Sequence, residues 1–340
     1  MNNAKSMGRR QFLRIIGVGA LAGVALKTGL DVTQGAETVS ATRLLMGTVV
    51  NLTLITDDVP AGQAAVTACL DEMAGLEMVM SRHRPDSQLT VLNRDGAINA
   101  PDARLVGLLQ EAARLSDLTG GAFDVTIKPV LDLYQSAQTV AGALPAEDAV
   151  QAALALVDYR DVQVSPERIA LARAGMGITL DGIAKGYIVD QGVAALKRHG
   201  CTNIMVEAGG DLAVSGGKSA VRPWRVGIQA PRQAEIDRLT ASFNVSNQAV
   251  ATSGDYMQPF TADFAEHHIL HPHTGHSGPA VASATVLARS GAVADALATA
   301  LLVMDIDQGI SAVEAFADCE SYMLAKDLTV AQSTGFPAML

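Results

Sequence analysis

The pattern of apolar and polar positions first indicates strands. Residues 43–56 (RLLMGTVVNLTLIT) alternate apolar and polar side chains and are rich in β-branched residues, which predicts one strand. Residues 204–206 and 212–214 are short apolar runs joined by the turn EAGGD, which predicts a hairpin. Short runs of the same kind predict further strands at residues 162–164, 169–171, 224–229, 242–246, 283–288 and 321–325.

Other segments carry apolar residues at helical spacing. They predict helices at residues 60–80, 101–119, 145–157, 183–199 and 292–304. Residues 81–93, SRHRPDSQLTVLN, indicate a polar loop. Strands and helices do not alternate strictly, which argues against a doubly wound parallel sheet. We therefore expect one compact domain over residues 37–340, of mixed α/β class, with antiparallel sheets flanked by helices.

Residues 1–36 form a separate segment. The paired arginines Arg9 and Arg10 precede a mildly apolar run from Ile15 to Leu26, a pattern typical of a twin-arginine export signal. The run is short and rich in Gly and Ala for a membrane span, and the alternative is a short N-terminal anchor helix that stays uncleaved. Residues 34–36 are a plausible cleavage region. These features predict a mature protein in a bacterial periplasm.

Charge narrows the choice of ligand. The chain of 340 residues has a net charge of −10, and residues 1–36 hold five of its 25 basic residues and one of its 35 acidic residues. The remainder, with 20 basic and 34 acidic residues, has a net charge of −14. Such a body repels nucleic acid and anionic membranes, and an anionic ligand needs a local positive group or a bound cation. Cys69, Cys201 and Cys319 are far apart and are interpreted as buried thiols, with one disulfide as the alternative.

The segment TLDGIAKGYIVD is the first candidate site. Asp181 and Lys185 lie four residues apart at the expected start of a helix, where unpaired backbone N–H groups, small residues and a lysine suit a phosphate. The alternative is an Asp helix cap with a surface ion pair between residues i and i+4.

A second candidate lies on the predicted helix 292–304. Asp295 and Thr299 are spaced i, i+4, so both side chains project from one face of the helix. A carboxylate and a hydroxyl are hard oxygen ligands, suited to Mg²⁺ shared with a phosphate. The alternative is that both side chains face solvent. The glycine-rich turns at residues 120–126 and 207–217 lack the GxGxxG pattern of dinucleotide-binding folds.

Residues 266–278, EHHILHPHTGHSG, hold five of the seven histidines. A zinc site needs three or four ligands that converge from a rigid frame, whereas Pro272, Thr274, Gly275 and Gly278 place turns between these imidazoles. We interpret HPHTG as a turn that leaves a short strand at residues 268–270. Apart from His268, we expect the histidines of this segment to be solvent or loop residues: His267, His271, His273 and His276.

In order along the chain, these segments resemble the ApbE family of bacterial FAD:protein FMN transferases. The matching stretches are MGTVV, MSRHRPDSQLTVLN, TGGAFDVTIKPV, LDGIAKGYIVD, EAGGDL, ATSGDY, HILHPHTG and ADALATAL, which run from about residue 43 to residue 303. The resemblance implies a T-fold-like domain with FAD in a central cleft. It also implies a reaction in which a Thr or Ser hydroxyl of an exported protein attacks the FMN phosphorus of Mg²⁺-bound FAD, and AMP leaves.

The resemblance also implies roles for individual residues. Asp295 and Thr299 match Mg²⁺ ligands, together with the carbonyl of Ala184. Asp181 and Lys185 match a pair beside the cofactor. Positions that line FAD are Met46, His83, Ala122, Phe123, Asp124 and Ile269. His268 opens the HI motif, and either His268 or Asp181 would be the general base.

Some positions depart from the family pattern. His83 stands where a tyrosine commonly stacks on the flavin, Glu207 replaces an Asn, and Val125 and Lys128 replace a Pro and a Gly. Two alternatives therefore stay open: a hydrolase that cleaves FAD to FMN and AMP, and a flavin-binding assembly factor without catalysis. The family's exported targets are flavoproteins of membrane electron-transfer complexes: sodium-pumping quinone reductases, Rnf complexes, and the membrane flavoprotein that supports nitrous oxide reductase.

Overall fold

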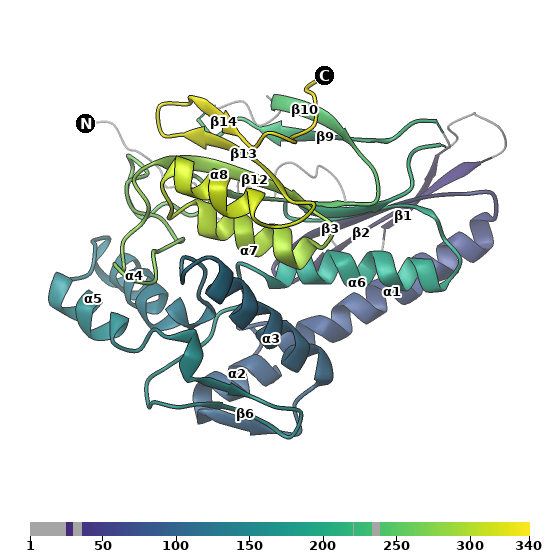
Figure 1. Ribbon diagram of the computed structural model, residues 1–340. Coiled ribbons are helices and arrows are strands. Elements are labelled where there is room, and N and C mark those ends of the chain that lie inside the picture. The colour runs from purple at the N-terminus through teal and green to yellow at the C-terminus, as the bar shows by residue number, and fades with distance from the viewer. Residues whose placement is uncertain (1–24, 30–35, 220, 233–238) are drawn as a thin grey trace.

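The computed structural model describes residues 25–29, 36–219, 221–232 and 239–340. Its centre is a nine-stranded sheet in the order β1-β2-β3-β7-β8-β11-β12-β13-β14 (Figure 1). The strands are β1 (Ala25–Gly29), β2 (Glu37–Leu45), β3 (Thr48–Thr56), β7 (Asn203–Ala208), β8 (Asp211–Ser215), β11 (Ala249–Gly254), β12 (Val281–Ala288), β13 (Glu320–Ala325) and β14 (Val330–Gln332). Every strand pair in the described ranges is antiparallel, as expected from the sequence.

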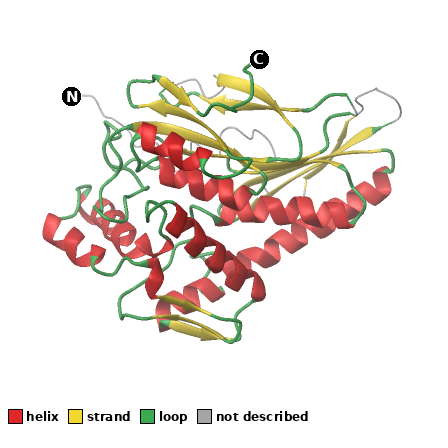
Figure 2. Ribbon diagram, in the orientation of Figure 1, coloured by secondary structure: helices red, strands yellow, loops and turns green. Residues whose placement is uncertain are grey.

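Helices cover one face of this sheet (Figure 2). They are α1 (Val59–Met80), α6 (Ala184–Arg198), α7 (Gly291–Leu301) and α8 (Ile306–Glu314). Helices α6 and α7 cross without room for side chains: a Cβ added to Gly186 would lie 2.0 Å from the carbonyl oxygen of Gly291. This close crossing brings the first turn of α6 against the middle of α7.

A two-stranded sheet packs on the opposite face. It consists of β9 (Trp224–Gln229) and β10 (Leu239–Val245). In β9, Trp224, Val226 and Ile228 are buried and the intervening residues are exposed, the alternation of a strand with one covered face. Phe243 of β10 joins them in a second core between the small sheet and the large sheet.

A smaller lobe lies beyond the helical layer. Its helices are α2 (Gln88–Asp95), α3 (Ala103–Leu118), α4 (Lys128–Ala141) and α5 (Glu147–Leu154), with short 3₁₀ turns η2 (Val125–Ile127) and η3 (Tyr159–Asp161). A three-stranded sheet completes it, formed by β4 (Ala97–Asn99), β6 (Arg168–Leu171) and β5 (Val162–Val164). No described helix is long and apolar enough to cross a membrane.

Two predictions about secondary structure before residue 100 are wrong. Residues 43–56 do not form one strand, because the chain turns between β2 and β3 at Met46 (φ 54°) and Gly47 (φ 71°), and two adjacent positive φ angles make a hairpin turn. Residues 81–93 are not only a polar loop, because α2 starts at Gln88. The Ser87 hydroxyl accepts a hydrogen bond from the Thr90 N–H, and the helix buries Leu89 and Leu92.

Most other predicted elements are confirmed. The helices predicted at residues 60–80, 101–119, 145–157, 183–199 and 292–304 correspond to α1, α3, α5, α6 and α7, and strand β9 has the predicted bounds. Helices α4 and α8 and strand β11 were not anticipated. The three cysteines are free thiols; Cys69 and Cys319 are buried, as interpreted, whereas Cys201 is half-buried. Most of the predicted export signal, residues 1–24 and 30–35, lies outside the described residues, so that assignment stays a prediction.

Candidate active site at the end of the central sheet

Lys185 lies between two buried carboxylates. Its Nζ contacts Asp211, at the start of β8, and lies 3.4 Å from Oδ1 of Asp295 on α7. Asp211 and Asp295 are 1% and 2% exposed, whereas 31% of the lysine side chain reaches solvent. Burial disfavours the ammonium, but the two carboxylates outweigh it and raise the pKa of Lys185. The three groups therefore form one charged cluster at the α6–α7 crossing.

This cluster carries surplus negative charge. Burial and the charge of Asp211 raise the pKa of Asp295 to about 7, against the opposing charge of Lys185. Its Oδ2 accepts a hydrogen bond of 3.0 Å from the Gly186 N–H in the first turn of α6. Two carboxylates that share one ammonium favour an additional cation over a bare anion at this position.

Hydroxyl groups lie beside the carboxylates. Thr299 lies one helical turn after Asp295, and its Oγ1 is 3.5 Å from the hydroxyl of Ser253 on β11. The Thr252 N–H donates to Oδ1 of Asp211 at 3.3 Å, which ties β11 to the start of β8. Carboxylates and hydroxyls together make a set of hard oxygen donors that fits Mg²⁺. Within the described ranges there is no group of three or more His, Cys, Asp and Glu side chains suited to a metal ion.

Asp181 and Lys185 do not pair with each other. The carboxylate of Asp181 instead accepts from Nε of Arg82 at 2.6 Å, just after the end of α1. The N-cap position of α6 is Ile183, which makes no capping bond, so the Asp cap and the i, i+4 ion pair considered from the sequence are both wrong. Because the Gly186 N–H is already bonded to Asp295, the ammonium of Lys185 is the group that can hold an anion here.

His268 lies close to these charges. Burial lowers its pKa to about 4; Asp181 opposes this shift, and Lys185 and Arg82 add to it. Its Nδ1 is buried without a hydrogen-bond partner, while its backbone N–H donates to the Gln258 carbonyl at 3.0 Å. The imidazole is therefore neutral near pH 7 and has a nitrogen available to accept a proton.

The other histidines of this segment do not gather at one point. His267 lies in this loop, as expected, but it is fully buried and does not face solvent. His271 and His273 form a ring pair with centroids 5.3 Å apart. His276 contacts Tyr134, Glu266 and Glu147. The strand expected at residues 268–270 is also wrong, since only isolated bridges form, Pro259 with His267 and Leu270 with Ser277.

A buried ion cluster anchors the loop that leads to His268. Asp255 follows β11, is fully buried, and accepts two bonds of 2.6 Å from Arg232 and one of 2.7 Å from Lys326. Lys326 also donates to the Phe264 carbonyl at 2.7 Å, and the Arg232 guanidinium lies 4.4 Å from the centre of the Phe264 ring. The loop between β11 and His268 is thereby fixed to β13 and to the segment after β9.

The positions expected to line FAD have different roles in the fold. Met46 lies in the β2–β3 turn, and its N–H donates to Oε1 of Glu77 near the end of α1. Ala122, Phe123 and Asp124 are buried. The Asp124 carboxylate accepts from the N–H and hydroxyl of Thr126 and from the Tyr159 N–H. It therefore stabilises the turn in which it lies. Ile269 is 9% exposed in the main core, and His83 is exposed.

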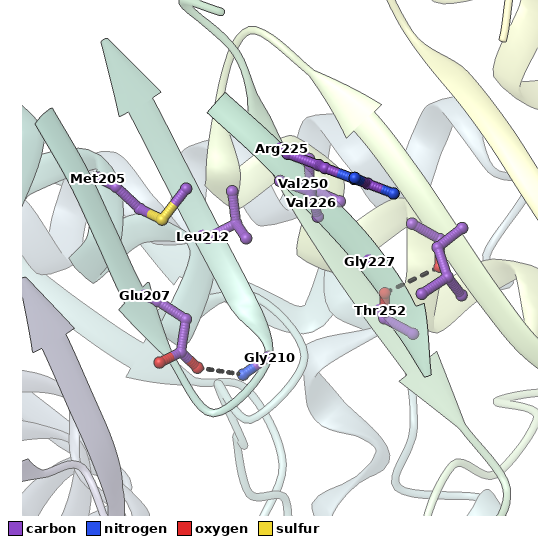
Figure 3. Close-up of a pocket in the computed structure, with 11 residues that line it drawn as sticks. Met205, Glu207, Gly210, Leu212, Arg225, Val226, Gly227, Val250 and Thr252 are labelled. Atoms are coloured by element: carbon purple, nitrogen blue, oxygen red, sulfur yellow. Dashed lines mark hydrogen bonds between the residues drawn. The ribbon is translucent and has the colours of Figure 1, made fainter. Parts of the chain in front are cut away.

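Two cavities lie near these segments, and neither is lined by Lys185 or Asp295. One, of about 350 Å³, lies between the turn at Gly120 and Ala122 and the histidines His271 and His273. The other, of about 260 Å³, lies on the opposite face of the sheet along β9 (Figure 3).

Sequence reasoning missed three residues of the site: Asp211, Ser253 and Arg82. Asp211 stands in the AGGD turn and Ser253 in the stretch ATSGDY, so each lay inside a motif without having been singled out. The available signal was that each residue is a carboxylate or a hydroxyl near one end of a strand. Arg82 carried no signal apart from its position in the polar segment after α1.

An acid–lysine cluster at the end of an antiparallel sheet, with hydroxyl groups beside it, suits a ligand that brings a cation together with phosphate groups. The sequence profile of the ApbE family matches residues 46–323, and the chain belongs to this family. An FAD:protein FMN transferase of Vibrio cholerae is 31% identical over 306 residues, 87% of this chain and 90% of the relative. One of Treponema pallidum is 33% identical over 297 residues, 80% of this chain and 81% of the relative.

Solved structures agree. The flavin transferase ApbE from Vibrio cholerae superposes with a TM-score of 0.76 at 29% identity, covering 88% of this chain and 98% of that one. The ApbE protein of Thermotoga maritima gives a TM-score of 0.79 at 28% identity with the same coverage. The predicted fold, a mixed α/β single domain with antiparallel sheets and flanking helices, is thereby confirmed.

Proposed function

We propose that this chain transfers FMN from FAD to a threonine or serine hydroxyl of a target flavoprotein and releases AMP, with Mg²⁺ as the metal. The chain is a transferase of the FAD:protein FMN transferase type, as its relatives are. The observation that carries the proposal is the buried cluster of Lys185, Asp211 and Asp295 at the first turn of α6. It supplies both an ammonium for phosphate oxygens and carboxylates for a cation.

The metal assignment rests on oxygen donors from two elements. The side chains of Asp295 and Thr299 and the backbone carbonyl of Ala184 would hold Mg²⁺, with Asp211 facing the same lysine. When bound, the ion offsets the charge of the FAD pyrophosphate and the charge that develops on departing AMP. Lys185 would bind a pyrophosphate oxygen. Its positive charge also offsets the repulsion between the two buried carboxylates.

The proton of the attacking hydroxyl needs an acceptor, and we assign this role to His268. The hydroxyl oxygen bonds to the FMN phosphorus, the bond from that phosphorus to the AMP phosphate oxygen breaks, and the hydroxyl proton passes to the imidazole of His268. Asp181 is the weaker candidate because Arg82 already occupies its carboxylate. Asp181 instead fixes Arg82 close to the phosphate site.

FAD would lie along the positions that the family pattern assigns to it. These are Met46, His83, Ala122, Phe123, Asp124, Asp181, Lys185 and Ile269. The backbone of residues 122–124 is the part that faces the ligand, since the Asp124 carboxylate is occupied by its own turn. The exposed imidazole of His83 offers a smaller stacking surface than a tyrosine and therefore binds the flavin ring less tightly.

The place of action follows from the N-terminal pattern. Residues 1–36 would direct export by the twin-arginine pathway, so that the mature protein modifies targets in the periplasm. The partner class is an exported flavoprotein of a membrane electron-transfer complex, of the quinone reductase or Rnf type or the flavoprotein that supports nitrous oxide reductase.

One assay tests the proposal. Residues 37–340 are incubated with FAD, Mg²⁺ and candidate exported flavoproteins, and protein-bound flavin fluorescence in a denaturing gel is measured together with free AMP. A fluorescent target with equimolar AMP is the expected result. AMP and FMN without an adduct would show hydrolysis instead, and recovery of intact FAD would leave a binding protein.

A further inference from the structure

Strand β9 has one edge without a partner strand. It pairs with β10 on one side, and no other strand in the described part of the chain pairs with it. Four consecutive residues of β9, from Arg225 to Ile228, line the 260 Å³ cavity. Because their side chains alternate between two faces, the cavity must run along the strand's edge and not along one face (Figure 3).

The floor of this cavity is the outer face of the large sheet. Met205 on β7, Leu212 on β8, and Val250 and Thr252 on β11 form it, and they are mostly apolar. We call this space the β9 groove. Glu207 and Arg225 place one charge of each sign along it. A half-open apolar floor beside an unpaired strand edge is the geometry that accepts an extended peptide as an added strand.

The β9 groove ends next to the acid–lysine cluster. Gly210 lines the groove, and Asp211, the next residue, contacts Lys185 from the other face of the sheet. Thr252 also lines the groove, and the following residue, Ser253, is 3.5 Å from Thr299. Strands β8 and β11 pair only at Ala249 with Ala213 and at Val250 with Leu212, so they are no longer paired where Asp211 and Ser253 lie.

We propose that the β9 groove receives an extended segment of the acceptor protein, which adds as a strand to the free edge of β9. The segment's hydroxyl residue passes around the sheet end at Gly210 and reaches the phosphorus held beside Lys185. Strand addition would hold a polypeptide acceptor through hydrogen bonds to its backbone. The outer edge of β10 is a poorer choice, because the Leu340 N–H already donates to the Ser242 carbonyl there. This inference rests on the proposed function.

The first test fills the groove. Met205→Trp adds bulk to its floor, and Leu144→Trp places the same ring at an exposed site in the smaller lobe as a control. Using the acceptor labelled in the transfer assay, we expect Met205→Trp to raise the KM for acceptor about tenfold and leave the affinity for FAD unchanged. Leu144→Trp should match the wild type in both.

The second test uses the wild-type chain and so does not depend on how a variant folds. Strand addition protects backbone amides, so hydrogen exchange in residues 224–229 should slow when acceptor is added and not when FAD alone is added. Unchanged exchange with acceptor at saturation, or wild-type KM in a folded Met205→Trp, overturns the docking inference alone. If FAD alone slows hydrogen exchange in residues 224–229, the groove binds the cofactor, and the docking inference is overturned as well. If the wild-type chain labels no acceptor, the proposed function and this inference are both refuted.

Discussion

The ammonium nitrogen of Lys185 lies 3.4 Å from Oδ1 of Asp295, across the crossing of α6 and α7. The two residues are 110 positions apart in sequence and meet because glycines at the crossing leave no side chain between the helices. Asp211 completes the contact from β8. The chemistry of the site therefore depends on a helix-packing distance, and its residues respond to substitution as a group.

Removing the metal carboxylate should remove the metal response. Asp295→Ala is expected to abolish Mg²⁺-dependent flavin transfer while the fold stays largely intact, because a buried carboxylate of raised pKa contributes little to stability. Transfer rates across a Mg²⁺ titration, with the thermal midpoint as a fold check, measure this. Asp307→Ala, an exposed carboxylate on α8, is the matched control. Full activity in Asp295→Ala would refute the metal assignment.

Removing the ammonium should cost stability as well as activity. Lys185→Met leaves Asp211 and Asp295 buried together without a counter-charge. We expect a loss of about 2 kcal/mol in the free energy of unfolding, less than for a fully buried pair because part of the lysine side chain reaches solvent. Adding Asp211→Asn to this variant should recover part of the loss in urea unfolding at pH 8. An additive, further loss in the double variant would contradict the charge-cluster interpretation.

The proposed base predicts an unequal histidine series. His268→Ala should slow transfer by about a hundredfold or more, the usual contribution of general base catalysis, whereas His271→Ala, His273→Ala and His276→Ala should stay near wild type. Because burial lowers the pKa of His268 to about 4, the free imidazole is neutral above that pH. The acidic limb of kcat/KM due to this group should therefore lie near pH 4 and not near 6.5. Equal losses across the four variants would favour a histidine metal site instead.

His267 should make the protein sensitive to acid. Burial lowers its pKa to about 3, with His268, Lys326, Asp255 and Arg232 as the charged or titratable neighbours. A depressed histidine pKa gives stability that is fully present above the unfolded value near 6.5 and is lost progressively as pH falls toward 3. His267→Gln should flatten the fall of the thermal midpoint between pH 7 and pH 5. The exposed His273→Gln should not, and an identical slope in wild type and His267→Gln would count against this account.

The sequence predicted those parts of the site whose residues lie close together along the chain. Asp295 and Thr299 share one helix face, as their spacing requires, and both adjoin the cluster. Asp181 and Lys185 were correctly placed at a helix start, but their partners were not predicted. Arg82 and Asp211 come from elements about 100 and 26 residues away, and no spacing rule reports such contacts.

The sequence by itself determined the alternation of β9, the spacing of the main helices, the surplus acidity, and the ordered motifs that mark the family. These are properties of neighbouring residues, governed by backbone period and side-chain type. Only the tertiary structure decided that 43–56 turns back on itself, that the five histidines do not gather at one point, and that Lys185 faces two acids. It also decided that no other strand of the described residues pairs with the second edge of β9. These features arise from packing between distant segments, where the free energy of burial, and not local preference, selects the partner.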